Sequence, residues 1–238
     1  MNTANLSFAG EAYKVLEEKI VTLELKPSTL YTEKELMAIS GRGRTPTREA
    51  VQRLAHDMLV QILPRQGVLI EPIDIARTLM TLDVRARLEP MMMARAAQFS
   101  DADARALFQR IARRIEDSID GTDELVFPRL DRRFTRLAMQ CARHEVAARI
   151  LLPLHAVSRR IGFLSAEKRQ DRQRASSALH AVIAGAIADG DQDLAASATS
   201  ELIEHGRAIA LAVEDEGLED IAAELRPFSD TDPLGDVW

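Results

Sequence analysis

Residues 42–48, with the sequence Arg-Gly-Arg-Thr-Pro-Thr-Arg, place guanidinium groups and hydroxyls close together on a short stretch of chain. A guanidinium group can bind a guanine edge or a phosphate through two parallel hydrogen bonds, and hydroxyls commonly bind phosphate oxygens. This chemistry suits double-stranded DNA. The residues expected to contact DNA are Lys34, Arg42, Arg44, Thr45, Thr47, Arg48, Arg65 and Gly67. The alternative is that these arginines only keep a turn hydrated.

The net charge of the chain is −6, which by itself argues against nucleic-acid binding. The charge is unevenly distributed, however. Residues 26–66 carry a net charge of +3, whereas residues 214–238 carry −8. A basic segment therefore precedes an acidic tail, and the overall charge does not exclude DNA as a partner.

The residues around the arginines predict a winged helix-turn-helix. Apolar residues recur at helical spacing in residues 9–25, 32–40 and 45–58, and two short apolar runs then flank Pro64-Arg65-Gln66-Gly67 as in a hairpin. In such a fold the start of the third helix enters the major groove and the hairpin lies beside it.

Local signals mark where these helices begin and end. Thr32 and Glu35 have the spacing of a capping box, and Gly41 can end the second helix in a left-handed conformation. Thr45 is expected to cap the third helix, with Pro46 at its first position.

After residue 72 only helical patterns follow, so the fold class is mainly α. We expect a DNA-binding domain over residues 1–72, a bundle of six or seven helices over 73–225, and a disordered acidic tail over 226–238. The predicted helices of the bundle span residues 75–99, 102–119, 123–142, 144–162, 167–189 and 192–214, with a short last helix near 217–225.

The composition favours a cytoplasmic protein. The single cysteine, Cys141, cannot form an internal disulfide bond, and no apolar stretch is long enough for a membrane span or typical of a signal peptide.

Residues 12–72 resemble the DNA-binding domain of the GntR family of bacterial transcriptional regulators, through the Arg-Thr-Pro-Thr-Arg-Glu-Ala run and the later Arg-x-Gly. The resemblance places Lys34, Arg44, Thr45, Arg48 and Gly67 on DNA-contacting positions. It implies a homodimer on an inverted-repeat operator. Gly43, Arg42 and Thr47 depart from the residues that the family usually has there, so the operator sequence does not follow.

Residues 76–212 resemble the FCD subgroup of that family, through Val84-Arg85-x-x-Leu88-Glu89, Asp131-x-x-Phe134 and Leu179-His180. The C-terminal domain of this subgroup binds small effectors, commonly organic acids. It usually holds a divalent metal through one aspartate and three histidines.

The metal ligands of the subgroup are only partly present. The resemblance places Asp131 and His180 on ligand positions, but Thr135 and Leu202 stand where histidines are usual. We expect a weakened or absent metal site and no certain cofactor. Alternatively, His180 is an ordinary core histidine and Asp131 pairs with an arginine.

The effector pocket is expected to contain Arg85, Asp131, Thr135 and His180. Arg85 could bind an effector carboxylate in place of the metal, or it could form an ion pair with Glu89 one turn away.

Three functions remain open. The first is a transcriptional regulator, by family habit a repressor, that responds to an organic acid. The second is an enzyme using Asp131 and His180 as acid and base, although no nucleophile or cofactor motif accompanies them. The third is an architectural DNA-binding protein without an effector. A cavity shared by Asp131, His180 and Arg85 would favour the regulator, and an apolar interior the architectural protein.

Overall fold

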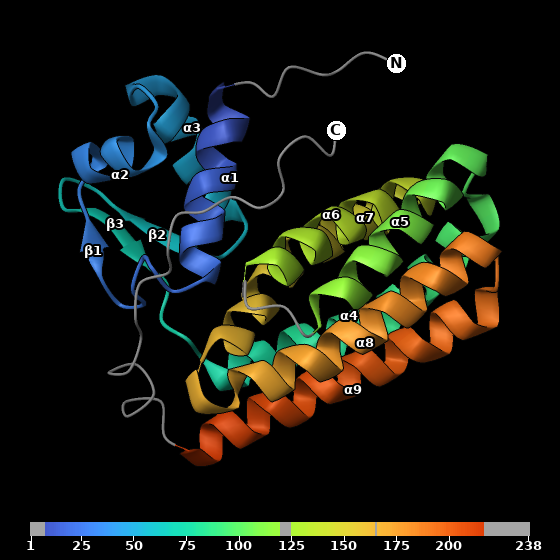
Figure 1. Ribbon diagram of the computed structural model, residues 1–238. Helices are drawn as coiled ribbons and strands as arrows, with labels where there is room; N and C mark the ends of the chain where they lie inside the picture. Colours follow the sequence, from blue (N-terminus) through green and yellow to red (C-terminus); the bar gives the residue numbers. More distant parts are fainter. Residues whose placement is uncertain (1–7, 120–124, 165, 217–238) are drawn as a thin grey trace.

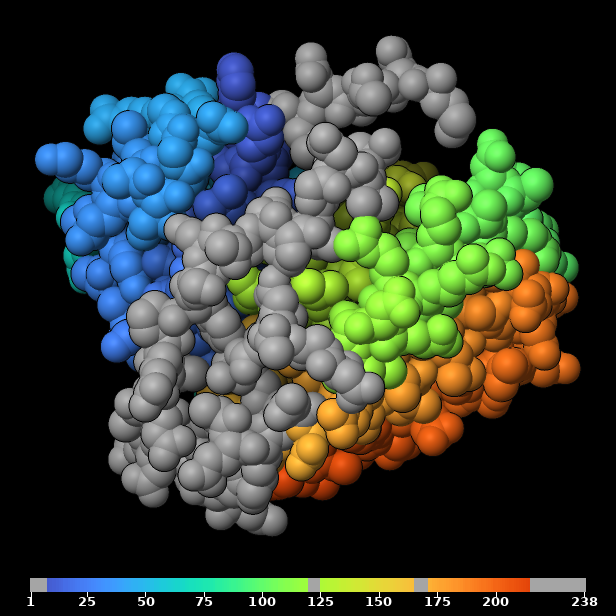
Figure 2. Space-filling view, viewed as in Figure 1, coloured from blue at the N-terminus to red at the C-terminus, as the bar shows by residue number. Residues whose placement is uncertain are grey.

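The computed structural model describes residues 8–119, 125–164 and 166–216, and it shows a small winged domain at one end of a long helical bundle (Figure 1). In the space-filling view the N-terminal domain, in blue, lies to the left of the bundle, in green to orange (Figure 2). The elements of the N-terminal domain are α1 (Phe8–Val21), β1 (Leu30–Tyr31), α2 (Glu33–Ser40), α3 (Arg44–His56), β2 (Val60–Leu63) and β3 (Gly67–Ile70).

The predicted hairpin is present, and the sheet has a third strand that the sequence pattern did not predict. Strands β2 and β3 pair antiparallel with Val60 opposite Ile70, and β1 pairs with the other edge of β3 with Leu30 opposite Leu69. Strand β1 has only two residues, too few to show an alternating pattern.

The capping signals around α2 are confirmed. Thr32 Oγ1 accepts the amide of Glu35 at 3.3 Å, and the Glu35 carboxylate accepts the amide of Thr32 at 2.7 Å. Gly41 ends the helix with a φ of 63°. Helix α1 is shorter than predicted because the chain turns at Leu23, whose φ is 64°.

The predicted start of α3 is wrong. The helix begins at Arg44, and Gly43 rather than Thr45 is the N-cap residue, without a side-chain hydrogen bond. Thr45 and Pro46 therefore lie within the first turn of the helix. The carbonyl of Gly43 accepts the first intrahelical hydrogen bond, from the amide of Thr47 at 3.1 Å.

The predicted helical bundle is confirmed over the described residues. Its elements are α4 (Ile75–Phe99), α5 (Ala102–Ser118), α6 (Val126–Cys141), α7 (Glu145–Arg159), the short 3-10 helix η1 (Arg160–Phe163), α8 (Ala166–Asp189) and α9 (Gln192–Glu216). The expected helix near 217–225 and the tail 226–238 lie outside the described residues. Among the helices described, none is long and apolar enough to cross a membrane.

The structure has two hydrophobic clusters, and the boundary between them does not coincide with the domain boundary predicted at residue 72. One cluster combines the interior of the N-terminal domain, including Leu16 and Leu54, with Val157, Ile161 and Val213 from the end of the bundle. A second cluster fills the other end of the bundle. The Arg160 guanidinium also donates to the carbonyls of Glu71 and Pro72, at 2.6 and 3.4 Å, on the segment that joins the domains.

Candidate DNA interface and effector pocket

The predicted DNA-binding residues form an exposed surface on α2, α3 and the wing, by which we mean the β2–β3 hairpin. Lys34, Arg44, Thr45, Arg48 and Arg65 are all exposed. The Arg44 side chain is 74% exposed and pairs with Glu33 at 2.9 Å. Arg42 pairs with Glu11 at 2.8 Å. Exposed ion pairs are weak, so these guanidinium groups can exchange their carboxylate partners for phosphate or base edges.

Thr47 does not belong to this surface, and its prediction as a DNA contact is wrong. Its side chain is fully buried, with Oγ1 3.1 Å from Ser40 Oγ and 3.3 Å from the carbonyl oxygen of Arg42. Thr47 therefore links the start of α3 to the end of α2. The exposed face of α3 is formed by neighbouring residues such as Arg44, Thr45 and Arg48.

Gly67 has a structural reason to be glycine, independent of any contact with DNA. Its φ is 140°, and a Cβ atom placed there would lie 2.5 Å from the carbonyl oxygen of Tyr31. Any side chain would push β1 away from β3. The sequence predicted Gly67 as a DNA contact, which stays a prediction.

A cavity of about 120 Å³ lies in the half of the bundle nearer the N-terminal domain, between α4, α6, α7, α8 and α9. Its wall includes apolar side chains such as Leu82, Phe163 and Ile209. A cavity of ~150 Å³ can hold benzene, so this one suits a molecule of similar size. The charged and imidazole side chains that line it are Arg85, Asp131, His155, Arg159, Arg172 and His180.

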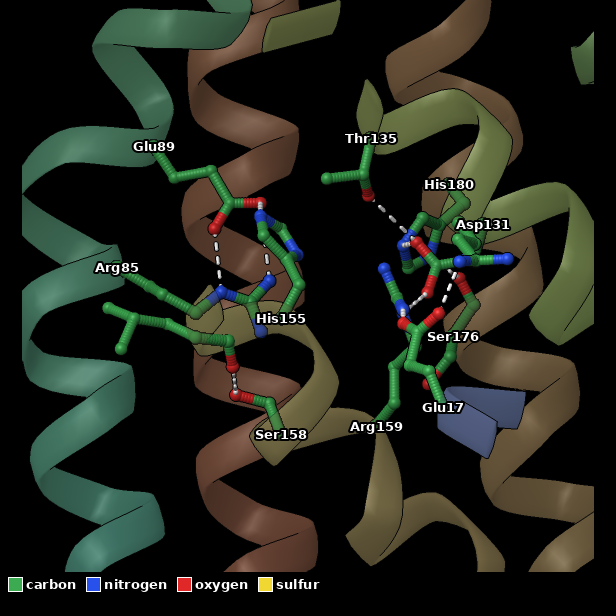
Figure 3. A network of polar contacts seen from close by, with 12 residues as sticks. Glu17, Arg85, Glu89, Asp131, Thr135, His155, Ser158, Arg159, Ser176 and His180 are labelled. Carbon is green, nitrogen blue, oxygen red and sulfur yellow. Dashed lines mark hydrogen bonds and ion pairs between the residues drawn. The ribbon is translucent and has the colours of Figure 1, made fainter. Parts of the chain in front are cut away.

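Asp131 is the centre of one polar cluster in the cavity wall (Figure 3). Its Oδ2 accepts from Arg159 Nε at 2.6 Å, and its Oδ1 lies 3.1 Å from His180 Nε2 and 3.2 Å from Thr135 Oγ1. Burial alone would raise the pKa of Asp131, but Arg159 and His180 together hold it well below its ordinary value. Asp131 is therefore a carboxylate whose two oxygens are both engaged.

The donor set of this cluster does not fit a divalent metal. His180 Nδ1 lies 2.7 Å from the Ser176 carbonyl oxygen, and its Nε2 lies 3.1 Å from Asp131 Oδ1. The Thr135 hydroxyl and the apolar Leu202 stand where further imidazole ligands would be needed, so Asp131 and His180 alone leave most of the coordination shell of a divalent metal unfilled. Across the described residues no group of three or more His, Cys, Asp or Glu side chains is arranged to hold one.

Arg85 and Glu89 form the second polar cluster. Their ion pair is the alternative to effector binding that the sequence left open for Arg85. Its Nε and Nη2 donate to the Glu89 carboxylate at 2.7 and 3.2 Å, and the pair is buried rather than exposed. Arg85 also lines the cavity. Arg85, Asp131 and His180 therefore line one cavity, as a regulator with an effector pocket would require.

Thr135 has a different place from the one predicted. Its side chain is 1% exposed and donates to Asp131, and it does not line the cavity. Direct contact with an effector is therefore wrong for Thr135, whose hydroxyl positions the Asp131 carboxylate instead.

Three charged or imidazole residues of the cavity wall were not predicted from the sequence: His155, Arg159 and Arg172. Two of them, His155 and Arg159, belong to α7. They lie one turn apart on α7, so a search for polar residues at helical spacing in an apolar helix could have found them. Burial lowers the pKa of His155 to about 3, so the ring is neutral at physiological pH. Its Nε2 has no hydrogen-bond partner in the part of the chain that the structure describes, although Glu89 lies 3.6 Å away.

One further residue that the sequence did not predict, Glu17, lies outside the bundle, on α1. Its carboxylate pairs with Arg132 at 2.5 Å and with Arg159 at 3.3 Å. Glu17 lies among the buried residues of α1, between Tyr13 and Ile20. An acidic residue on an apolar helix face was the signal available in the sequence.

A winged helix-turn-helix joined to a helical domain with a polar cavity defines the architecture of a bacterial transcriptional regulator. Models of known families agree with this class. The model described as "Bacterial regulatory proteins, gntR family" matches residues 8–70, and that described as "FCD domain" matches residues 80–205. The chain belongs to the GntR family, with an FCD domain at its C-terminal end, and it is a regulator rather than an enzyme.

Individual relatives agree. The HTH-type transcriptional repressor RspR of Escherichia coli K12 is 29% identical over 157 residues, which are 65% of this chain and 68% of that protein. An uncharacterised HTH-type regulator of Streptomyces ambofaciens is 40% identical over 67 residues, and the match spans only 28% of either protein.

Solved structures show the same fold. The E. coli protein McbR/YncC superposes with a TM-score of 0.73 at 17% identity, over 87% of this chain and 99% of that one. A GntR regulator from Rhodococcus gives 0.60 at 16% identity, over 87% and 98%.

Proposed function

We propose that this protein is a cytoplasmic repressor that binds an inverted-repeat operator as a homodimer and responds to a small carboxylate in the bundle cavity. The observation that carries the effector class is the set of arginines in the cavity wall. Three arginines, Arg85, Arg159 and Arg172, line the cavity together with a single carboxylate, that of Asp131. Arg85 and Arg159 also hold the buried carboxylates of Glu89 and Glu17, so an effector carboxylate binds by sharing or replacing these partners, through two parallel hydrogen bonds from a guanidinium.

The size and lining of the cavity further restrict the range of possible effectors. A volume of about 120 Å³ with apolar side chains beside the arginines suits a compact carboxylate with a hydrocarbon part. The neutral His155 ring offers this ligand one further polar atom. The donor set lacks the ligands of a tight metal site, so effector binding needs no metal in this proposal.

The repressor role is supported by the printed name of the relative RspR and by family habit. A regulator of this kind works only if the effector binds the DNA-bound and free conformations with different affinity. The architectural alternative is disfavoured because Arg85, Asp131 and His180 share a cavity instead of an apolar interior.

The test begins with selecting bound fragments from a genomic library, which supplies the operator. Operator affinity is then measured with benzoate, hexanoate and succinate, and with benzylamine as a cationic control of similar size. We expect at least one carboxylate, and not benzylamine, to weaken operator binding by about 5–150-fold. Equal responses to benzylamine and the carboxylates, or no response to any of them, would contradict the effector class.

Metal independence and repression are tested separately. Prior treatment with EDTA should leave the carboxylate response intact. In cells, deletion of the gene should raise transcription from the selected operator, and a fall in transcription would assign an activator role instead.

A further inference from the structure

We propose that Arg159 couples the cavity to the DNA-binding domain, because one guanidinium group serves both the cavity wall and Glu17 of α1. This inference rests on the proposed carboxylate effector and names the contact through which that effector acts. In the structure Arg159 holds α1 against the bundle through Glu17. A carboxylate in the cavity displaces Glu17 from Arg159.

The contacts of Arg159 divide its guanidinium between two domains (Figure 3). Nε donates to Asp131 Oδ2 at 2.6 Å, within the cavity wall. Nη1 donates to Glu17 Oε1 at 3.3 Å, on α1. The Arg159 and Glu17 side chains are only 13% and 5% exposed, so water screens their interaction little.

The geometry of a guanidinium group explains the competition. A carboxylate binds most favourably along an edge that presents two parallel N–H groups. Asp131 uses Nε, so the edge available to a carboxylate in the cavity is formed by Nη1 and Nη2. Occupying that edge removes Nη1 from Glu17 and leaves the Asp131 contact in place.

Glu17 is placed to pass this change on to the recognition helix. Helix α1 lies between the bundle and the helices α2 and α3 (Figure 1). One turn before Glu17, Tyr13 donates to Asp57 at the end of α3, at 2.6 Å and in a buried environment. The two contacts lie on one rigid helix, so a shift of α1 at Glu17 moves α3 as well.

The loss of Arg159 loosens this link without abolishing it. Glu17 keeps its ion pair with Arg132 of α6 at 2.5 Å. The proposed change is therefore a reorientation of the DNA-binding domain, which in a dimer alters the distance between two recognition helices.

The chain contains a matched control on the same helix. Glu18 also joins α1 to α6, through Arg129 at 2.7 Å, but Arg129 does not line the cavity. Glu17→Gln and Glu18→Gln thus remove the same charge at neighbouring positions. Only the first removes a partner of a residue in the cavity wall.

The main experiment compares operator affinity with and without the tightest-binding member of the carboxylate panel, in wild type and both variants. In Glu17→Gln the carboxylate should still bind, by calorimetry, but its effect on operator affinity should fall to within about twofold, compared with about 5–150-fold for a coupled regulator. Glu18→Gln should respond like the wild type. Equal responses in the two variants would overturn the role of Glu17 while leaving the carboxylate effector standing.

A second measurement uses the wild-type protein and needs neither operator nor variant. Hydrogen exchange of the α1 amides should speed up when the carboxylate saturates the cavity, because the helix loses one of its links to the bundle. Unchanged α1 exchange at saturation would overturn the coupling. If no carboxylate of the panel binds, the effector class itself is wrong, which is a different outcome.

Discussion

Arginines perform different tasks in the two domains, and their burial accounts for the difference. Arg44 on α3 is 74% exposed and has one ion pair. Arg159 on α7 is 13% exposed and is shared between two carboxylates. An exposed arginine changes partners at little cost, as DNA recognition requires, whereas a buried one changes partner only when another anion replaces the first.

The largest difference between the domains should appear when a buried carboxylate is removed. Asp131→Ala leaves the buried Arg159 without its Asp131 counter-ion and His180 without a hydrogen-bond partner, and we expect the free energy of unfolding to fall by about 3–5 kcal/mol in denaturant titrations. Asp83→Ala is the control, because Asp83 pairs with Arg207 but is 65% exposed. That variant should lose less than about 1 kcal/mol. Similar losses in both variants would show that burial does not distinguish these ion pairs.

The exposed arginines should matter for DNA binding. If Arg44 donates two hydrogen bonds to a base edge, Arg44→Ala should weaken binding to the selected operator by about 1–3 kcal/mol. Fluorescence anisotropy measures this affinity. Arg113→Ala removes an exposed arginine from α5 and should leave operator affinity unchanged. An unaltered affinity in the Arg44 variant would remove Arg44 from the recognition surface.

The buried site should also respond to pH. His155 has a pKa of about 3 in the folded protein because of burial, with Glu89, Arg85, Arg159 and Asp131 as charged neighbours, against about 6.5 when unfolded. Protons therefore bind the unfolded state preferentially. The free energy of unfolding should fall as the pH drops below 6.5, by up to about 1.4 kcal/mol per pH unit.

His155→Gln should remove this contribution, which is measured as the difference in slope between wild type and variant from pH 6.5 to 4.5. The carboxylates and the other histidines are common to both proteins, so the difference in slope reports His155. Identical slopes would mean that His155 titrates normally.

The smallest effect belongs to the exposed ion pair. Glu33→Gln removes the partner of Arg44, yet the free energy of unfolding should change by less than about 1 kcal/mol because both side chains are well exposed. Operator affinity should not decrease, since Arg44 no longer has to leave a carboxylate. A larger loss of stability would show that the Arg44–Glu33 ion pair contributes as much as a buried ion pair.

The sequence predicted the DNA-binding domain better than the cavity because the signals of the former are local. The capping box at Thr32 and the left-handed turn at Gly41 each depend on residues a few positions apart. Two of the errors in this domain came from packing between its elements. Thr47 turned inward toward Ser40, and β1 formed only because β3 lay beside it.

The cavity depends on residues that are distant in the chain. Asp131, Arg159 and His180 lie on three helices, and Glu17 belongs to the other domain. Helical periodicity can place each residue on an inward face, but it cannot state which inward faces meet. The resemblance supplied Asp131 and His180. The contact between Arg159 and Glu17 required the structure.

The shared hydrophobic core at the domain junction has a consequence for folding cooperativity. Leu16 and Leu54 belong to the same cluster as Val157 and Ile161, so separating the domains would expose apolar surface on both. The two domains should therefore melt together in a single calorimetric transition. A chimaera built by joining residues 1–72 to an unrelated bundle would need to bring the corner formed by α7 and η1 with it.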